Sequence, residues 1–346
     1  MRGRRGERGI VLVMVLVFAL LLVSSIATFE RRAVVDAVIS RNRENGLRAE
    51  ALARGGLEFA TALVLDDRLQ EGAEPGLDSQ LDLWHKTRDY PIPVGGGTVR
   101  LTIRDTGELL NLNAVFNAHQ GDQLSPHAKP FLVALLTKVV DDQALPPDQE
   151  SPYDPNQLAD NLIDWADPDH ERQEGGDEDA FYQQQDPPYR APNHALLSVE
   201  ELRLVEGFDA RLSKALESYV TVYPYAGTHG VNLNTAAPHV LALVFSNDGV
   251  NYELATQEVV EKVVAAREDN KLICAASPGE SSGQNACTPI SELVTNAQAI
   301  FPPPTFSTDV FLVEVEARLG DVTRTLDAVI DRGDPANLQL LSWRMR

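Results

Sequence analysis

Residues 9–29 read GIVLVMVLVFALLLVSSIATF, and this stretch sets the architecture of the whole chain. Twenty residues, Ile10 to Phe29, carry no charge. At a helical rise of about 1.5 Å per residue they span roughly 30 Å, the hydrocarbon thickness of a bilayer. Four arginines lie among the first eight residues, and positive charge keeps the flanking end of such a helix in the cytoplasm. The sequence therefore predicts one membrane-spanning segment, residues 10–29, with everything after it exported.

Three interpretations of this segment compete. It is a plain signal anchor, or a secretory signal removed after Ala27 at the small-residue site Ser25-Ile26-Ala27. The third interpretation places the cut on the cytoplasmic side, between Gly9 and Ile10, so that the apolar helix stays on the mature protein. A glycine between a short basic leader and an unbroken apolar helix favours this third interpretation. Residues 1–9 are then a leader, and Ile10 is the new N-terminus.

Residues 9–14, on their basic leader, resemble a type IV prepilin signal. Such signals normally carry glutamate at the fifth mature position, where this chain has Met14. One subclass shares this departure, the minor pseudopilin K of type II secretion systems. By resemblance, the glutamate of a fibre subunit meets the N-terminal amine of the neighbour nearer the tip. A tip subunit has no such neighbour, and its glutamate would be buried without a partner charge. Met14 therefore indicates placement at the tip.

The N-terminal helix is expected to continue well beyond the membrane. Residues 30–70 contain no proline and carry apolar residues at mostly helical spacing. Gly46, Gly55 and Gly56 are weak points, because a helical glycine costs up to about 1 kcal/mol relative to alanine. The periplasmic part of the helix is therefore predicted to end near residue 70.

Alternating apolar and polar residues predict antiparallel strands on either side of a long gap. Residues 98–104 place three apolar side chains on one face, and residues 313–330 alternate in the same way around a Gly-Asp turn. The last residues, 338–346, suit either a further strand or a basic tail. A long N-terminal helix packed on a small antiparallel sheet is the type IV pilin-like fold, which is an α+β architecture.

The gap between the strands is too long to be a loop. Six segments within it have helical character, namely residues 126–141, 155–165, 199–206, 210–218, 236–245 and 257–268. We therefore expect a pilin-like α/β domain made of residues 71–113 and 301–346, interrupted by a large inserted all-α domain at residues 114–300. By resemblance, such an insertion is the hallmark of the pseudopilin K family.

Short segments along the insertion carry the same resemblance in order and spacing: Asn111–Ala114, Leu162–Asp169, Tyr189–Asn193, Ser198–Gly207 and Val231–Pro238. The Asn-rich segments are interpreted as structural turns. In the last segment, Asn234 or Thr235 is expected to cap the helix that begins near Ala236, because such side chains accept hydrogen bonds from free N–H groups at a helix start.

Residues 164–179 contain eight carboxylates around the pair Gly175-Gly176. Calcium takes six to eight oxygen ligands in a flexible array, although the spacing is not that of an EF-hand. Composition alone favours a solvated acidic loop. Members of the pseudopilin K family, however, bind calcium in this region, so the resemblance implies a structural calcium ion. The expected ligands are Asp167, Asp169, Glu174, Asp177, Glu178 and Asp179.

Charge and cysteine content constrain the remaining functions. A formal net charge of −21 repels phosphate backbones, so nucleic acid is not an expected partner. Cys274 and Cys287 are the two cysteines, and a local disulfide is the simplest interpretation in an oxidising compartment. Seven scattered histidines and the absence of nucleophile or phosphate-binding motifs favour a protein that is not an enzyme.

The resemblance as a whole implies a minor pseudopilin of the inner membrane, with a single pass, a cytoplasmic N-terminus and a periplasmic C-terminal domain. Its implied partners are minor pseudopilins I and J, the major pseudopilin and the prepilin peptidase, with exoprotein substrates as further candidates. It would support pseudopilus assembly and export of folded proteins across the outer membrane, with Ile10 methylated. Two alternatives stay open: a type IV pilus tip minor pilin, and a membrane-anchored periplasmic enzyme.

Overall fold

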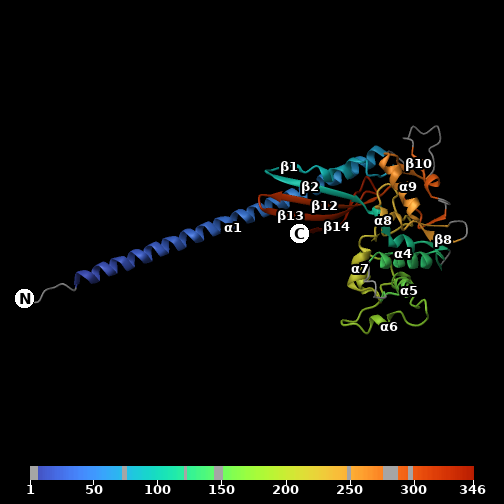
Figure 1. The fold of residues 1–346 in the computed structure, drawn as a ribbon, viewed down its shortest axis with the longest axis horizontal. Helices are drawn as coiled ribbons and strands as arrows, with labels where there is room; N and C mark the ends of the chain where they lie inside the picture. Colours follow the sequence, from blue (N-terminus) through green and yellow to red (C-terminus); the bar gives the residue numbers. More distant parts are fainter. Residues whose placement is uncertain are drawn as a thin grey trace, which may run out of the picture.

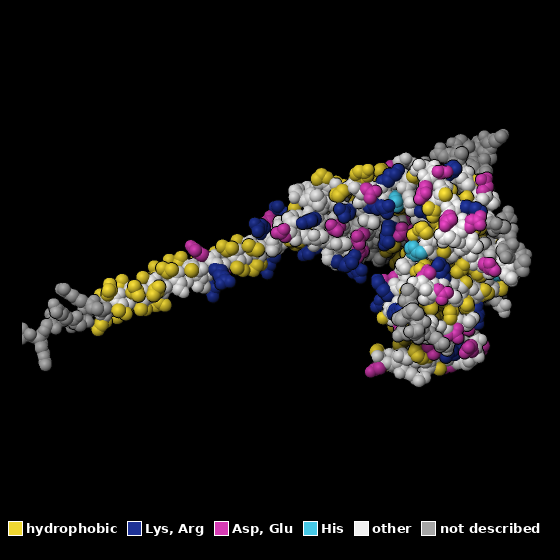
Figure 2. All heavy atoms as spheres, in the orientation of Figure 1, with side chains coloured by type: hydrophobic (Ala, Val, Ile, Leu, Met, Phe, Trp, Pro, Cys, Tyr) yellow, Lys and Arg dark blue, Asp and Glu magenta, His cyan; other side chains and the backbone are white. Residues whose placement is uncertain are grey.

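A single helix, α1 (Glu7–Glu71), runs for 65 residues and projects far from the rest of the molecule (Figure 1). The computed structural model describes residues 7–71, 76–120, 123–143, 151–247, 251–275, 287–294 and 299–346. Every residue from Ile10 to Glu44 is exposed. Hydrophobic side chains cover the outer stretch of this projecting part, and charged side chains appear on it nearer the sheet (Figure 2). By length and composition the apolar part is suited to cross a membrane. The helix predicted across residues 10–70 is therefore one continuous element.

The remaining part of α1 lies along a five-stranded sheet in the order β1-β2-β12-β13-β14, with every neighbouring pair antiparallel. Its strands are β1 (Ile92–Val94), β2 (Gly97–Asp105), β12 (Val310–Leu319), β13 (Val322–Asp331) and β14 (Gln339–Met345). The strands predicted from alternation are present, and the last residues form a strand rather than a tail. The fold class is the predicted α+β arrangement of a long helix on an antiparallel sheet.

Small side chains form the face of α1 that meets the sheet. The buried residues recur every three or four positions: Gly46, Ala49, Ala53, Gly56, Ala60 and Val64. They pack against the inward face of the sheet, including Val99, Leu101 and Val315. A Cβ atom on Gly56 would lie 2.5 Å from Cγ1 of Val315, so glycine is needed there for close approach of helix and sheet. Gly56 is thus a packing site and not a weak point.

The insertion leaves and re-enters the sheet at one place. Strand β2 ends at Asp105, and Asp105 pairs directly with Phe311 at the start of β12. Strand β3 (Leu110–Asn111) already pairs with a strand inside the insertion, β6 (Val220–Thr221). The insertion therefore begins and ends closer to the sheet than the predicted limits of residues 114 and 300. Figure 1 places it at the end of the sheet away from the N-terminus.

The insertion is mainly helical and contains short strands that the sequence pattern did not predict. Its longer helices are α4 (Ala128–Asp142), α5 (Pro155–Ala166), α7 (Ala210–Leu216) and α9 (Gln257–Glu268). Shorter helices and 3-10 turns are α2 (Leu83–Lys86) and η1 (Thr87–Asp89) before the sheet, then η2 (Thr106–Glu108), α3 (Leu112–Phe116), α6 (Asp179–Tyr182), η3 (Val199–Leu204), α8 (Pro238–Leu241) and α10 (Ile290–Leu293).

The remaining strands of the insertion are β4 (His119–Gln120), β5 (Gln123–Leu124), β7 (Phe245–Asn247), β8 (Tyr252–Leu254), β9 (Ile273–Cys274), β10 (Thr288–Pro289) and β11 (Ile300–Phe301). The helix predicted at residues 236–245 is shorter than expected and gives way to β7, which pairs with β8 and β11. An all-α insertion is therefore corrected to a mixed one. A short apolar run fits a buried strand as well as a helix, and here tertiary pairing selects the strand.

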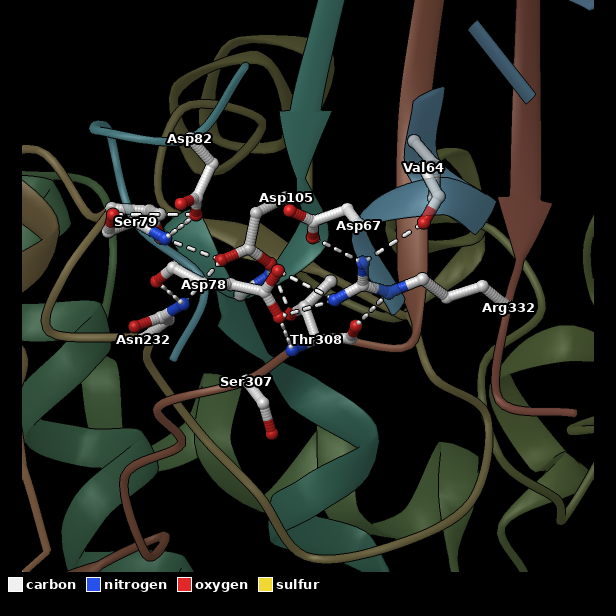
Figure 3. A network of polar contacts seen from close by, with 12 residues as sticks. Val64, Asp67, Asp78, Ser79, Asp82, Asp105, Asn232, Ser307, Thr308 and Arg332 are labelled. Atoms are coloured by element: carbon white, nitrogen blue, oxygen red, sulfur yellow. Dashed lines mark hydrogen bonds and ion pairs between the residues drawn. The ribbon is translucent and has the colours of Figure 1, made fainter. Parts of the chain in front are cut away.

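A buried arginine joins the end of α1 to the sheet (Figure 3). Arg332 is fully buried and donates two hydrogen bonds from Nη2 to the carboxylate of Asp78, at 2.6 and 2.8 Å. Its Nη1 donates to Asp67 at 2.7 Å and to the carbonyl of Val64 at 3.2 Å, both on α1. Its Nε donates to the carbonyl of Thr308. One guanidinium thus ties the residue that follows β13 to three other segments, namely α1, Asp78 and Thr308.

A buried carboxylate fastens the insertion to the same region. Asp105 accepts hydrogen bonds from Nδ2 of Asn232 and Oγ1 of Thr235, each at 2.7 Å, and from the hydroxyl of Thr308. The helix-cap prediction is wrong, because Thr235 bonds Asp105 and the Asn234 side chain bonds the backbone of Ile273. Helix α8 has no side-chain cap. The Asn-rich turn therefore ties the insertion to the sheet.

Candidate metal centre

Helix α5 fixes the first acidic side chain of the site. The helix begins with Asp154, whose side chain accepts a hydrogen bond from the backbone N–H of Asn156 at 2.9 Å, and with proline at its first position. Its apolar face enters the core of the insertion, so Asp164, in the last turn of the helix, is drawn inside and is 4% exposed. A carboxylate in such a place needs a partner.

Asp164, Asp167 and Glu178 come together where the loop after α5 folds back. One oxygen from each of these carboxylates lies within 4.8 Å of the other two, the only such acidic group within the described parts of the chain. The backbone N–H of Gln173 donates to Asp164 at 2.9 Å, and Nε of Arg172 lies 3.9 Å from the same carboxylate. The fold thus gathers three negative groups around one small space.

The surroundings disfavour the ionised form of all three carboxyl groups. Burial raises the pKa of Asp164 to about 6. Burial also raises the pKa of Asp167 to about 7, and the nearby charges of Asp169 and Glu178 add to the effect. The pKa of Glu178 is raised as well, again chiefly by burial. A bound cation would relieve both the repulsion and the loss of hydration.

Free oxygens at the site fit an oxygen-seeking cation. Oδ1 of Asp167, Oε1 of Glu178 and Oδ1 of Asn193 are buried without a hydrogen-bond partner among the described residues. Asn193 adopts a φ of 50°, a left-handed conformation that asparagine tolerates, and its Nδ2 donates to Glu178 at 2.9 Å. Carboxylate and amide oxygens are the ligands that calcium takes, so the donor set suits that ion.

Most of the other ligands expected from the sequence make different contacts. The side chain of Asp169 accepts from the backbone of Glu171 at 2.8 Å, and that of Asp177 accepts from the backbone of Asp179 at 3.0 Å. Asp179 accepts from the backbone N–H of Ala191 at 3.1 Å, and Glu174 is exposed. Of the six expected residues, the cluster contains Asp167 and Glu178. Asp164 and Asn193 are candidate ligands that sequence reasoning missed.

The cluster has a route to solvent. A cleft of about 630 Å³ lies beside it, and its lining includes Asp167, Asn193, Phe116 and Leu124. An ion can therefore approach the cluster at Asp167 and Asn193 without opening the core of the insertion, as a metal site requires.

The remaining predicted sites lie far from this cluster. Gly9 and Ile10 are inside α1, so their peptide bond is helical. Met14 is 58% exposed on the projecting part of α1. Cys274 and Cys287 are joined by a disulfide, with Cα atoms 5.9 Å apart. The first three of these residues lie on α1 and the two cysteines lie in the insertion, apart from the acidic cluster.

Comparison with known proteins identifies the family. The sequence model of the family "Type II secretion system (T2SS), protein K" matches residues 108–225. The type II secretion system protein K of Klebsiella pneumoniae is 33% identical over 239 residues, which are 69% of this chain and 69% of the relative. The chain belongs to the type II secretion system protein K family. It is thus a component of a secretion system, and the resemblance found in the sequence is confirmed.

Other members of the protein K family extend the similarity. The Aeromonas hydrophila protein is 28% identical over 73% of this chain and 72% of its own length. The Pseudomonas aeruginosa protein is 26% identical over 99% of this chain and 94% of its own length, so the likeness includes the N-terminal helix. The stretch that the family model matches contains Asp164, Asp167, Glu178 and Asn193.

A solved structure shares the fold. It is the GspK-GspI-GspJ complex from the type 2 secretion system of enterotoxigenic Escherichia coli, matched with a TM-score of 0.58 over 89% of this chain and 99% of that chain. Identity between the two is 18%, so this likeness concerns the fold alone. The pilin-like helix and sheet with a large insertion is therefore the architecture of a known member of the protein K family.

Proposed function

We propose that this protein is the minor pseudopilin at the tip of a type II secretion pseudopilus, where it supports fibre assembly and export of folded proteins across the outer membrane. The observation that carries the proposal is the place of the insertion. It extends from the end of the sheet away from the N-terminus (Figure 1), where a further subunit would otherwise stack. A bulky domain at that end stops growth of the fibre in that direction.

The N-terminal segment supports the same role. Cleavage between Gly9 and Ile10, followed by methylation of Ile10, would leave an apolar helix anchored once in the inner membrane with the folded part in the periplasm. The N-terminal sequence of the mature protein tests this proposal, and a start at Ile10 is the expected result. Gly9→Ala should leave the precursor uncut and abolish secretion, whereas Gly3→Ala, in the same leader, should not. A start at Thr28 would contradict the proposal and favour a removed signal peptide.

Met14 is a second support for tip placement, and the solved relative suggests the partners. The solved relative is a complex of GspK with GspI and GspJ, and we propose the corresponding minor pseudopilins I and J as partners here, together with the major pseudopilin. Prepilin peptidase is the proposed processing enzyme. Met14→Glu would place a carboxylate in the apolar helix with no subunit ahead to neutralise it. We expect weaker co-purification with I and J than for Met14→Leu, and equal recovery would contradict the tip assignment.

We further propose that Asp164, Asp167, Glu178 and the side-chain carbonyl of Asn193 hold a structural calcium ion. The ion would supply the positive charge that the buried carboxylates lack and would fix the loop after α5. Calcium at 100 times its dissociation constant should raise the free energy of unfolding by about 2.7 kcal/mol. The melting temperature of the full chain, with calcium and then with EGTA, measures this effect.

A matched pair of variants locates the ion. Asp167→Asn removes a charge from the cluster, and Asp177→Asn removes one from the exposed loop nearby. The first should abolish the calcium-dependent rise in melting temperature, and the second should keep it. An equal calcium response of both variants would indicate that calcium binds to exposed residues of the loop and not to the buried cluster. No response in the unmodified chain would contradict a calcium site altogether.

A further inference from the structure

A second cleft lies where the segment after α1 meets the end of α9. It has a volume of about 340 Å³, and it is separate from the acidic cluster and its neighbouring cleft. One wall comes from Ser79 to Asp89 and the other from Arg267 to Leu272. The two walls are distant in sequence and belong to the helix–sheet unit and the insertion respectively.

The lining of this cleft is basic, although the whole chain carries a net charge of −21. Its basic side chains are His85, Lys86, Arg88, Arg267 and Lys271, and its acidic ones are Asp89 and Glu268. Figure 2 shows Lys and Arg side chains around a histidine where the sheet meets the insertion. A concave surface lined by one sign of charge focuses the field and attracts the opposite sign.

Arg267 is the central group of this basic cleft. It is half-buried, and its Nη1 donates to the carbonyl of Ala236 at 2.5 Å. Within the described part of the chain, it has no carboxylate at ion-pair distance, and burial lowers the pKa of its guanidinium. A partly buried guanidinium with no counter-charge is costly, and planar bidentate binding of a carboxylate or phosphate would satisfy it.

Two further positive charges, Arg88 and Lys271, lie at the surface of the cleft, beside the imidazole of His85. Burial lowers the pKa of His85, and the charges of Arg88 and Arg267 contribute to the effect. Among the described residues, Arg88 has one ion pair, a long one of 3.8 Å with its neighbour Asp89, and Lys271 pairs with Asp269 at 3.0 Å on the exposed surface. Both long side chains are exposed and can turn toward a bound anion.

We propose that this basic cleft binds an acidic segment of a protein partner through the carboxylates of that segment. Lipid headgroups are out of reach in the proposed topology, because the part of α1 beyond Phe29 separates the cleft from the bilayer by about 60 Å of helix. A nucleic acid would extend beyond the cleft and meet the negative charge of the rest of the chain, whereas a short acidic segment can stay within the basic lining. A carboxylate side chain carried on a peptide is the anion that fits a periplasmic cleft of this size and sign.

The test uses the full chain in detergent and a fluorescein-labelled octaglutamate peptide, with binding followed by fluorescence anisotropy. The double variant Arg88→Glu/Lys271→Glu reverses two charges of the cleft. The matched control, Lys262→Glu/Arg318→Glu, reverses two exposed charges elsewhere and changes the net charge equally. We expect the cleft variant to bind about tenfold more weakly or worse, and the control to stay within about twofold of the unmodified chain.

The outcomes separate the alternatives. Equal weakening of both double variants, or no binding by the unmodified chain, would overturn the proposal. Competition by inorganic phosphate as strong as that by unlabelled octaglutamate would reduce the cleft to a site for a simple anion and would also overturn it. The neutral variant Arg88→Gln/Lys271→Gln guards against misfolding caused by charge reversal, and intermediate weakening is expected from it.

Discussion

Two adjacent glycines in α1 offer a direct test of how the helix meets the sheet. A Cβ atom added to Gly56 would lie 2.5 Å from Cγ1 of Val315 and 2.9 Å from Cγ1 of Val99, whereas one added to Gly55 would meet nothing within 4 Å. Real Cβ contacts are not that short, so Gly56→Ala must push α1 away from β2 and β12. Gly55→Ala leaves the packing untouched.

The magnitude follows from two opposing terms. Replacing glycine by alanine within a helix gains up to about 1 kcal/mol at either position. Forcing an extra methyl group into a packed interface costs about 1–3 kcal/mol. Because the helical gain is common to both variants, it cancels when one is subtracted from the other. Gly56→Ala should therefore be less stable than Gly55→Ala by about 1–3 kcal/mol, the overpacking cost alone.

Urea unfolding of the full chain in detergent, followed by circular dichroism, measures both free energies of unfolding. Gly55→Ala should have a free energy of unfolding equal to or above that of the unmodified chain. The free energy of unfolding of Gly56→Ala should be lower than that of Gly55→Ala. Equal stabilisation by both substitutions would refute the reasoning, since it would mean that the helix can move off the sheet at no cost. Gly56→Ser, which adds one more atom in the same direction, should be less stable still.

Three further changes test the rest of the fold by unfolding measurements. Arg332→Met leaves Asp78 buried without its counter-charge and should cost about 3–5 kcal/mol, while adding Asp78→Leu should recover part of the loss; a Met variant as stable as the unmodified chain would contradict this. Burial raises the pKa of Glu108 to about 7, so the folded state holds an extra proton and stability should fall as pH rises from 4.5 to 7. Glu108→Gln should flatten this part of the curve of melting temperature against pH, and an unchanged slope would count against it. Replacing Cys274 and Cys287 by serine should lower the free energy of unfolding by about 3 kcal/mol, and a loss that reducing agent does not reproduce would point to another cause.

The regular parts of the fold can be predicted because local pattern and tertiary role agree there. Helix α9 is predicted at residues 257–268 and is found at those residues. The hairpin of β12 and β13 follows from alternation that is regular along most of β12 and partial in β13, because one face of the sheet is covered by α1 and the other is not. Strand β7 could not be predicted from the sequence, because three residues are too few to show an alternating apolar and polar pattern. Its conformation is set by pairing with β8 and β11.

Only part of the acidic site can be predicted from the sequence. Acidic composition draws attention to the loop, but ligand geometry depends on which side chains are pulled inward. Asp164 lies in the last turn of α5 and points into the core, and Asn193 arrives from a separate segment. The usable signals are the helical spacing between Asp164 and Asp167 and the asparagine in the segment 189–193. The exposed glycines and carboxylates at residues 171–177 dominate the composition of the loop, but they lie outside the cluster.

The pairing of Asp105 with Phe311 has a consequence for the engineering of this chain. Since paired strands lie about 5 Å apart, the two ends of the insertion could be joined by a simple hairpin turn without disturbing the sheet. The insertion could therefore be removed at a single point of the sheet. Its removal would take away Asn232 and Thr235, which bond Asp105, so this buried carboxylate would need a polar replacement partner or a substitution.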